Sequence, residues 1–528
     1  MARIPKIPNI SEDQMTPLIA ELAEIIHLQQ EVIQQLKDEI ARLKGQKGKP
    51  VIKPSGLEKP ASEGEKKNPE PGKRPGSAKR KKTEELEIHE TEIISPDNIP
   101  EGSQFKDYQD YVVQDIVIRT HNTRYRLERW QTPDGSYVIG KLPDEISGHF
   151  APTLISYILY QYHHAHVTQP LIPEALREFG IDISSGQLNR IITEEKEPFH
   201  AEKKEILLTG LGVSGHINVD DTKAGHNGRN GYCTHIGNDF FAWFESTESK
   251  SRINFLKLLC AGSISYIINT DALDYMAVKG LARFQIGKLS ELAGTCFDSE
   301  EKWKFCLDAL GITGERHVRI ATEGALLANV IENGLDPNLV IVSDDAGQFN
   351  ILLHSLCWVH TERSINKLVG FSEEQRQALE NKRSEIWDFY ADLNEYKKSP
   401  GEEKKEELER RFDEIFKGDT CFASLNQTLK RIHNNKSELL LVPDRPDIPL
   451  HNNLSESDIR EYVKKRKISG STRSEEGRRC RDTFASLKKT CRKLGISFWN
   501  FLKDRITGKG EIPSLSDLIR QRASESIP

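Results

Sequence analysis

GHINVDDTKAG, residues 215–225, is the stretch of this 528-residue chain that decides the fold. Apolar and polar residues alternate from His216 to Val219, which predicts a β-strand with one face turned toward a core. Two neighbouring acids, Asp220 and Asp221, follow at the end of this strand. Because successive side chains of a strand point to opposite faces, only one of the two acids can face a given site, and we favour Asp220.

Further strands and a helix are predicted around this stretch. Residues 231–247 alternate as an antiparallel partner would, and residues 251–262 form a predicted helix whose apolar face covers the sheet. Much later, the apolar run 339–343 ends at Asp344 and Asp345, of which we again favour the first. The pattern indicates an α/β fold in which two strands end in carboxylates.

A third acid comes from a later predicted helix. Helical spacing places Glu456 and Arg460 on one face. Lys464 and Lys467 continue roughly along that face, and Asn453 precedes them. Two acids at strand ends and one on a helix supply the hard oxygen ligands that hold two Mg²⁺ or Mn²⁺ ions about 3.5–4 Å apart. The pattern therefore predicts two-metal phosphoryl transfer, which needs no side-chain nucleophile.

Composition bounds the class of protein. With 29% charged residues, 37% hydrophobic residues and a net charge of −6, the chain is typical of a globular protein of several domains rather than of a histone-like binder. No run approaches the roughly 20 apolar residues of a membrane span, and the start lacks a secretory signal, so we expect a cytoplasmic protein with no membrane partner. The eight cysteines include no CxxC pair, which predicts reduced thiols.

Residues 1–44 contain a heptad seam. Apolar residues recur four and three apart from Ile19 on, interrupted only by Gln29. This favours a parallel coiled coil that joins two or more copies of the chain, and a helix lying on the chain's own core is the alternative. The Lys-, Pro- and Gly-rich residues 45–83 are predicted to be a basic flexible linker, which either contacts DNA phosphates or acts as a solvated spacer.

Two smaller units are expected before the predicted sheet. Short alternating runs within residues 84–145 predict a small β-rich module. Residues 146–205 are predicted to be helical, with helix-turn-helix-like spacing. The last helix of that spacing would present Gln187, Asn189 and Arg190 to a DNA groove, although many helical pairs with the same spacing touch no DNA.

Several motifs together resemble those of bacterial insertion-sequence transposases of family sixty-six, the TnpC-type DDE transposases. The motifs are YHHAHVTQPLIPEALREFGIDISSGQL (162–188), VDDT (219–222), SDDAGQFN (343–350), LCWVHTER (356–363) and HNNLSESDIREYVKKRKISGSTRSEEGRR (451–479). The resemblance spans most of the chain. By motif position it implies that Asp220, Asp344 and Glu456 are both the catalytic triad and the ligands of two Mg²⁺ or Mn²⁺ ions.

The resemblance also implies an architecture and an activity. It implies an RNase H-like catalytic core over residues 206–475, with an all-helical insertion at about 362–445 and a C-terminal helical region at 476–528. The segment at about 265–338 matches no general family pattern and is expected to be an extra subdomain. The implied activity is cleavage of transposon ends and strand transfer into target DNA. Terminal inverted repeats, target DNA, further copies of the chain and helper proteins of the same element are the implied partners, in the bacterial cytoplasm at the nucleoid.

Two departures from the family pattern matter. The family carries a cysteine-rich zinc finger before its helix-turn-helix region, but this chain has no cysteine before Cys233, so no zinc finger is expected. Cys357 and His360 offer two zinc ligands without a second pair, and we expect His360 instead to be an auxiliary active-site residue, together with Asn453. Ser457 stands where many relatives have Arg, so the phosphate contact expected there is either absent or supplied by Arg460.

A basic run follows the predicted catalytic glutamate. It consists of Lys464, Lys465, Arg466 and Lys467, with Arg473 shortly after. Such runs are usually solvated faces, but DNA must approach the metals closely, which favours phosphate binding here. Two rival functions stay open: an inactive DNA-binding or assembly protein derived from a transposase, and an RNase H-like nuclease. Metal-dependent nicking separates a transposase from the first, and strand joining after cutting separates it from the second.

Overall fold

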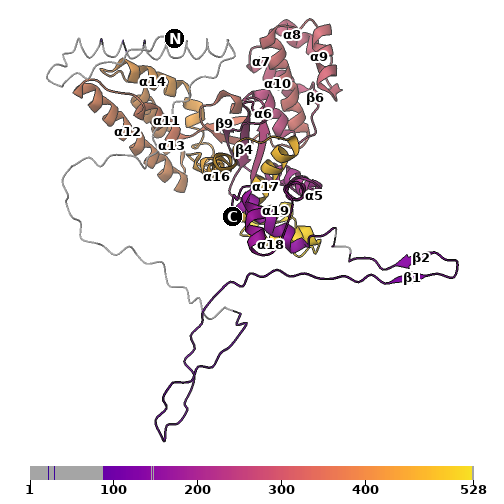
Figure 1. Ribbon diagram of the computed structural model, residues 1–528. Helices are drawn as coiled ribbons and strands as arrows, with labels where there is room; N and C mark the ends of the chain where they lie inside the picture. The colour runs from indigo at the N-terminus through magenta and orange to yellow at the C-terminus, as the bar shows by residue number, and fades with distance from the viewer. Residues whose placement is uncertain are drawn as a thin grey trace. The chain divides into compact units, whose positions relative to one another are not determined.

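The computed structural model describes residues 87–143, 146 and 148–525, together with Leu22, Ile26 and Gln29 (Figure 1). Apart from those three positions, the predicted coiled coil at 1–44 and the basic linker at 45–83 lie outside the described residues. The chain divides into two compact units, and the larger one includes everything from residue 122 onward. The sheet, the helices and the candidate site all belong to this larger unit.

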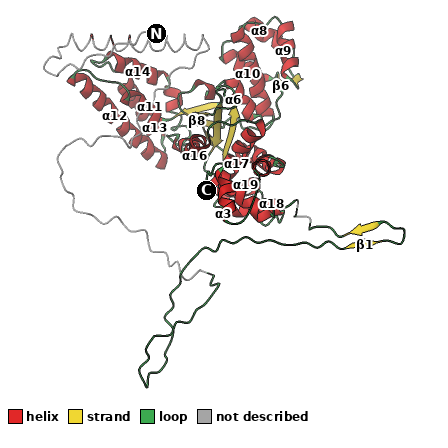
Figure 2. Ribbon diagram, in the orientation of Figure 1, coloured by secondary structure: helices red, strands yellow, loops and turns green. Residues whose placement is uncertain are grey.

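A five-stranded mixed sheet forms the centre of this unit, in the order β5-β4-β3-β8-β9 (Figure 2). Its strands are β3 (His216–Lys223), β4 (Tyr232–Gly237), β5 (Ala242–Thr247), β8 (Val340–Ser343) and β9 (Leu353–Leu356). β3, β4 and β5 pair antiparallel, whereas β8 pairs parallel with both β3 and β9. The expected α/β fold with a central sheet is confirmed, and the predicted strand at 231–247 is divided into a hairpin.

Alternation along the strands gives the sheet two different faces. Ile217 and Val219 of β3 are fully buried in the main apolar core. Asn218 and Asp220 occupy the alternate positions, on the face that helix α16 (Asn453–Ser469) covers. The main core therefore lies on one face of the sheet, and Asp220 lies on the other.

Helices that precede β3, or that lie between β5 and β8 in sequence, supply part of the main core. They are α5 (Glu197–Val213), α6 (Arg252–Leu259), α7 (Thr270–Val278), α8 (Arg283–Ser290), α9 (Glu300–Ala309) and α10 (Glu315–Glu332). Two short strands, β6 (Tyr266–Ile267) and β7 (Cys296–Phe297), pair antiparallel beside them. Helix α10 contacts both α6 and α7, and its apolar residues belong to the same core as the sheet. The segment at about 265–338 thus shares the core of the sheet.

A second apolar core lies on the other side of β8. Val342 of β8 belongs to it, with residues from the helices that follow β9. These helices are α11 (Trp358–Asn366), α12 (Glu373–Lys398), α13 (Glu402–Lys417), α14 (Ala423–Asn434) and α15 (Lys436–Leu439). Trp358 is fully buried at its centre, with ring centroids 5.3 Å from Phe389 and 6.1 Å from Phe412. The segment at about 362–445 is therefore a helical unit built around one tryptophan.

Helix α17 (Glu475–Lys493) lies along the edge of the sheet at β5. Asp482, Ser486 and Thr490, spaced four residues apart on one helical face, accept hydrogen bonds from alternate backbone N–H groups of β5 at 2.8–3.1 Å. An edge strand left open would present these groups to other chains. The helical C-terminal region continues with α18 (Phe498–Thr507) and α19 (Leu515–Glu525).

The region before the sheet is helical, with one hairpin ahead of it. The helices are α2 (Pro152–Leu159), the π-helical turn η2 (Tyr160–His164), α3 (Leu171–Glu178) and α4 (Ser185–Thr193). The Ser184 hydroxyl caps α4 by accepting a hydrogen bond from the N–H of Gln187 at 3.1 Å. Within residues 87–143, the strands are β1 (Arg129–Gln131) and β2 (Tyr137–Ile139), an exposed hairpin. The β-rich module expected at 84–145 therefore has much less strand than its alternation predicts.

Among the described residues, none of the helices combines the length and the apolar character that crossing a membrane requires.

Candidate active site

Asp220 and Asp344 are brought together by the parallel pairing of β3 and β8. Asn218 lies opposite Val342 in the register, so the two aspartates, each two residues further on, reach the same level of the sheet. Neighbouring strands are about 4.8 Å apart, so side chains at one level of adjacent strands lie close to each other. Two acids that are 124 residues apart in sequence thus lie at one level of the sheet. β3 continues past Asp220 to Lys223, paired with β4, so Asp220 does not lie at the strand end that the sequence predicted.

The Asp220 carboxylate lies in an unfavourable electrostatic position. Burial raises the pKa of Asp220 to about 7, and the negative charges of Asp344 and Asp221 add to this rise. The backbone N–H of Asp221, 2.7 Å from Oδ1, and the charge of Lys250 oppose the rise only in part. Clustered, partly buried carboxylate oxygens with too little positive charge around them suit a hard divalent cation such as Mg²⁺ or Mn²⁺.

The second acid of each pair is engaged with neutral donors. The Asp221 carboxylate accepts hydrogen bonds from Thr234 Oγ1 at 2.5 Å and from Gln348 Nε2 at 2.9 Å. Asp345 is exposed and accepts one from Asn435 Nδ2 at 3.3 Å. By contrast, within the described part of the chain, the only hydrogen bond to the Asp220 carboxylate is that from the backbone of Asp221.

Glu456 lies in the first turn of α16, and a buried asparagine fixes this turn to β3. Asn452, which is 0% exposed, donates a hydrogen bond from Nδ2 to the carbonyl of Val219 at 2.8 Å. Its Oδ1 accepts one from Asn218 Nδ2 at 2.9 Å. Since Asn218 and Val219 immediately precede Asp220, this link holds the helix that carries one candidate acid against the strand that carries another.

Three basic side chains surround the Glu456 carboxylate. Arg363 Nη1 lies 2.9 Å from Oε1, His360 Nε2 lies 3.5 Å from Oε1, and Arg460 Nη2 lies 3.7 Å from Oε2. Burial lowers the pKa of His360, although the charges of both Glu456 and Asp344 act in the opposite direction. His360 is therefore within electrostatic reach of two of the candidate acids.

The three acids do not form a finished metal cluster in this structure. Glu456 is directed at Arg363, and nowhere among the residues that the structure describes do three or more His, Cys, Asp or Glu side chains converge on a point that could hold a metal ion. Cys357, one of the two zinc ligands considered from sequence, is buried, and its Sγ accepts the N–H of Asn452 at 3.2 Å. Cys357 thus contacts the residue at the N-cap position of α16.

The predicted DNA-binding residues differ in exposure. On α16 and the loop after it, Lys464, Lys467 and Arg473 are exposed, as are Asn453 and Arg460 near its start. Asn189 and Arg190 of α4 are exposed and Gln187 is half-buried, on a helix whose small core is separate from that of the sheet.

Two residues of the basic run are turned inward. Arg466 is half-buried and donates hydrogen bonds to Thr222 Oγ1, at 3.2 Å, and to the carbonyl of Lys223. Lys465 is only 6% exposed.

A buried polar network behind α16 was not predicted. His235 of β4 lies opposite Asp220 in the sheet. Its Nδ1 is 2.6 Å from Ser455 Oγ and its Nε2 is 3.1 Å from Asp458 Oδ2, so it binds both residues that flank Glu456 on the inner face of α16. The signal in the sequence was the run of polar residues at alternate strand positions, because a polar side chain on a buried face needs a partner.

The geometry defines a mixed α/β protein with one acid within β3, a second directly after the neighbouring parallel strand β8, and a third on a helix tied to β3. A family model described as the transposase IS66 family matches residues 328–479, which run from the end of α10 into α17 and include Asp344 and Glu456. A relative from Sinorhizobium fredii (strain NBRC 101917 / NGR234), the uncharacterized protein y4jO, is 39% identical over 321 residues, which are 60% of this chain and 100% of the relative. The chain belongs to the transposase IS66 family.

Proposed function

We propose that this protein is a DNA transposase whose RNase H-like core uses Asp220, Asp344 and Glu456 to cut transposon ends and join them to target DNA. The observation that carries the proposal is the register of β3 with β8, which brings the first two acids to one level of the sheet. An antiparallel run of three strands followed by two parallel strands supports the RNase H-like core. Family membership supports the substrate class.

The donor set fits two divalent cations held by the three acids. When bound, such ions activate the attacking oxygen and stabilise the leaving oxygen in phosphoryl transfer. Asp220 and Asp344 present partly buried oxygens on β3 and directly after β8, and Asn452 ties α16, which carries Glu456, to β3. In this geometry Arg363 and His360 orient the Glu456 carboxylate, and in the working complex they would face the scissile phosphate.

DNA would reach this site across exposed cations. Lys464 and Lys467 of α16, with Arg473 beyond it, supply positive charge for backbone phosphates close to the acids. Asn189 and Arg190 of α4 would contact a groove of the end DNA. The predicted N-terminal coiled coil would pair the copies that hold the two ends.

The test uses the full chain and DNA duplexes that carry the ends of its element, which flanking inverted repeats identify. Asp220→Asn, Asp344→Asn and Glu456→Gln are expected to lose at least 100-fold in Mg²⁺- or Mn²⁺-dependent cleavage while still binding the duplex. Asp345→Asn, at the exposed neighbouring carboxylate, is the matched control and is expected to cleave normally.

Each other outcome contradicts the proposal in a distinct way. Binding without cleavage by the wild-type chain would indicate an assembly protein. Cleavage without strand joining would indicate a nuclease. Normal cleavage by Asp220→Asn would remove the site assignment itself.

A further inference from the structure

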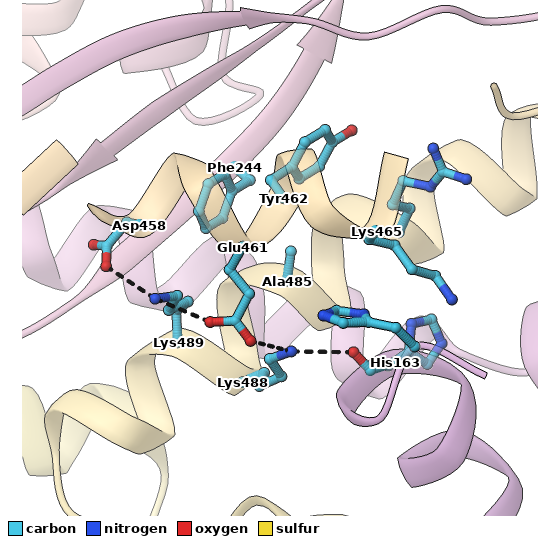
Figure 3. Close-up of a pocket in the computed structure, with 11 residues that line it drawn as sticks. His163, Phe244, Asp458, Glu461, Tyr462, Lys465, Ala485, Lys488 and Lys489 are labelled. Atoms are coloured by element: carbon cyan, nitrogen blue, oxygen red, sulfur yellow. Dashed lines mark hydrogen bonds and ion pairs between the residues drawn. The ribbon is translucent and has the colours of Figure 1, made fainter. Parts of the chain in front are cut away.

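A small hollow, about 30 Å³ in volume, lies behind α16 (Figure 3). Residues of η2 and the loop after it, of α16 and of α17 line it. Lys465 of α16 comes nine residues after Glu456, which is two and a half helical turns, so it points from the opposite side of the helix. The hollow is therefore separate from the candidate active site, although one helix contributes to both.

Four cationic side chains line this hollow, and all four are more than nine-tenths buried. They are Lys465, Arg481, Lys488 and Lys489. Only two acids line it with them, Asp458 and Glu461. The lining thus contains two more basic than acidic side chains, in a setting where bulk water cannot screen their charges.

The two acids are already paired. Glu461 forms ion pairs with Lys488 and, at 3.0 Å, with Lys489, and Asp458 lies 3.3 Å from Lys489 (Figure 3). Within the described part of the chain, no carboxylate lies within ion-pairing distance of Lys465. Its ammonium group instead donates to the carbonyl of Tyr162 at 2.6 Å and sits 3.5 Å from the centre of that ring.

Three buried nitrogens of the lining have no hydrogen-bond partner among the residues that the structure describes. They are His163 Nε2, His166 Nδ1 and Arg481 Nε, and His163 and Arg481 are 7% and 8% exposed. A buried polar atom without a partner costs about 1–3 kcal/mol, so proteins rarely leave several of them around one space. Their number in one small space indicates that an acceptor-rich group belongs there.

The backbone beside the hollow is irregular. Tyr160–His164 form a π-helical turn, and His166 is in the left-handed region with φ 60°. Such conformations are unfavourable for a residue with a side chain and cluster at functional sites. Here they direct the imidazoles of His163 and His166 at the lysines and the arginine of the other two helices.

We propose that this hollow binds one phosphate group, through Lys465, Arg481, His163 and His166. A phosphate offers several acceptor oxygens and one or two negative charges, which match the unpartnered nitrogens and the charge surplus. The present field is strongly positive: burial, together with Lys488 and Lys465, lowers the pKa of His166 to about 4, and burial, together with Arg481 and Lys488, lowers that of Lys465 to about 7. The negative charge of an anion in the hollow would act in the opposite direction and raise the pKa of both His166 and Lys465.

The phosphate belongs to a DNA strand, an assignment that rests on the proposed function. His166 is partly exposed, and three residues further on Gln169 donates a hydrogen bond to Asn189 Oδ1 of α4 at 3.3 Å, whereas Lys465 lies on the helix of Glu456. If a phosphodiester of DNA bound there, DNA bound to the N-terminal helices would also contact α16 and influence its position. Free phosphate is the other source of the same chemistry.

The first experiment measures thermal unfolding of the full chain during titration with inorganic phosphate at constant ionic strength. Phosphate is expected to raise the midpoint of the wild type saturably, to have no effect on Lys465→Met, and to act more weakly on His166→Asn, whose new side chain tolerates the left-handed backbone. Lys503→Met, an exposed lysine of α18, is the matched control and is expected to respond like the wild type. An equal response of all four proteins would overturn the proposal.

The second experiment identifies the source of the phosphate. If it is DNA, Lys465→Met weakens binding of an end duplex at least 10-fold and lowers the salt dependence by about one phosphate contact, while Lys503→Met changes binding less than 2-fold. Unchanged DNA binding by Lys465→Met, with the phosphate response lost, would assign the hollow to free phosphate and overturn the DNA assignment. Failure of the proposed function is distinguishable, because it would show as loss of cleavage by the wild type.

Discussion

Replacing Asn452 with Leu would test the link that holds α16 to β3. The side chains are similar in volume, but Leu can neither donate to the Val219 carbonyl nor accept from Asn218. Both asparagines are at most 1% exposed, so water cannot replace the lost bonds. At about 1–3 kcal/mol for each buried group left without its partner, the expected loss of stability is about 2–5 kcal/mol.

Urea unfolding, followed by tryptophan fluorescence, measures this loss. Asn218→Val alone should destabilise less, because it leaves only Asn452 Oδ1 without a partner. The double variant should lose less than the sum, because it leaves no unpaired side-chain amide. End cleavage by Asn452→Leu should fall by about 100-fold, since a displacement near 1 Å at a catalytic group has effects of that size. A loss below about 1 kcal/mol with normal cleavage would refute the reasoning.

Three further predictions follow from single contacts. Arg363→Met should change stability by less than about 1 kcal/mol, because Arg363 is 42% exposed, yet lower cleavage at least 10-fold, with Arg363→Lys recovering part of it in the same assay. Lys465→Met should raise the thermal midpoint, because burying the Lys465 ammonium group lowers its pKa to about 7 in the folded chain, against 10.5 for the free side chain. The cost of this buried charge is present in full below pH 7 and decreases progressively up to pH 10.5. That gain, on the order of a few kcal/mol, should therefore shrink as the pH of the melts is raised, and a gain independent of pH would contradict the cause. Trp358→Ala should destabilise the helical unit around it by about 3–5 kcal/mol, measured by calorimetry, since the ring is 1% exposed and contacts three other aromatic rings.

The sheet was predictable where the sequence carries a local pattern. Alternation around Asp220 and the apolar run before Asp344 located two strands, because burial on one face imposes a period of two, but β3 continues past Asp220 to Lys223 and only Asp344 follows the end of its strand. The same logic overestimated the strands of residues 84–145. There the apolar positions alternate, yet the described residues form one short hairpin whose side chains are exposed. Alternating apolar residues indicate that a strand would have one apolar face, but not that another part of the chain packs against that face.

The contacts around Glu456 could not be predicted in the same way. Asn452 and Asn218 are 234 residues apart, and nothing local to either indicates the other. Nothing in the sequence indicated that Arg363 lies 2.9 Å from Glu456. Lys465, taken from the sequence as one of a basic run, is buried because helical periodicity turns it away from its neighbours. Long-range partners of polar side chains depend on the topology.

Mn²⁺ binding by the full chain with end DNA, measured by electron paramagnetic resonance, tests most directly whether the three acids form one site. The wild type should bind about two Mn²⁺ per chain, and Asp220→Asn, Asp344→Asn and Glu456→Gln should each lose at least one, while Asp345→Asn keeps both. An unchanged stoichiometry in Glu456→Gln would show that the helix-borne acid does not share the ions of the two strand-end acids, and would contradict the site.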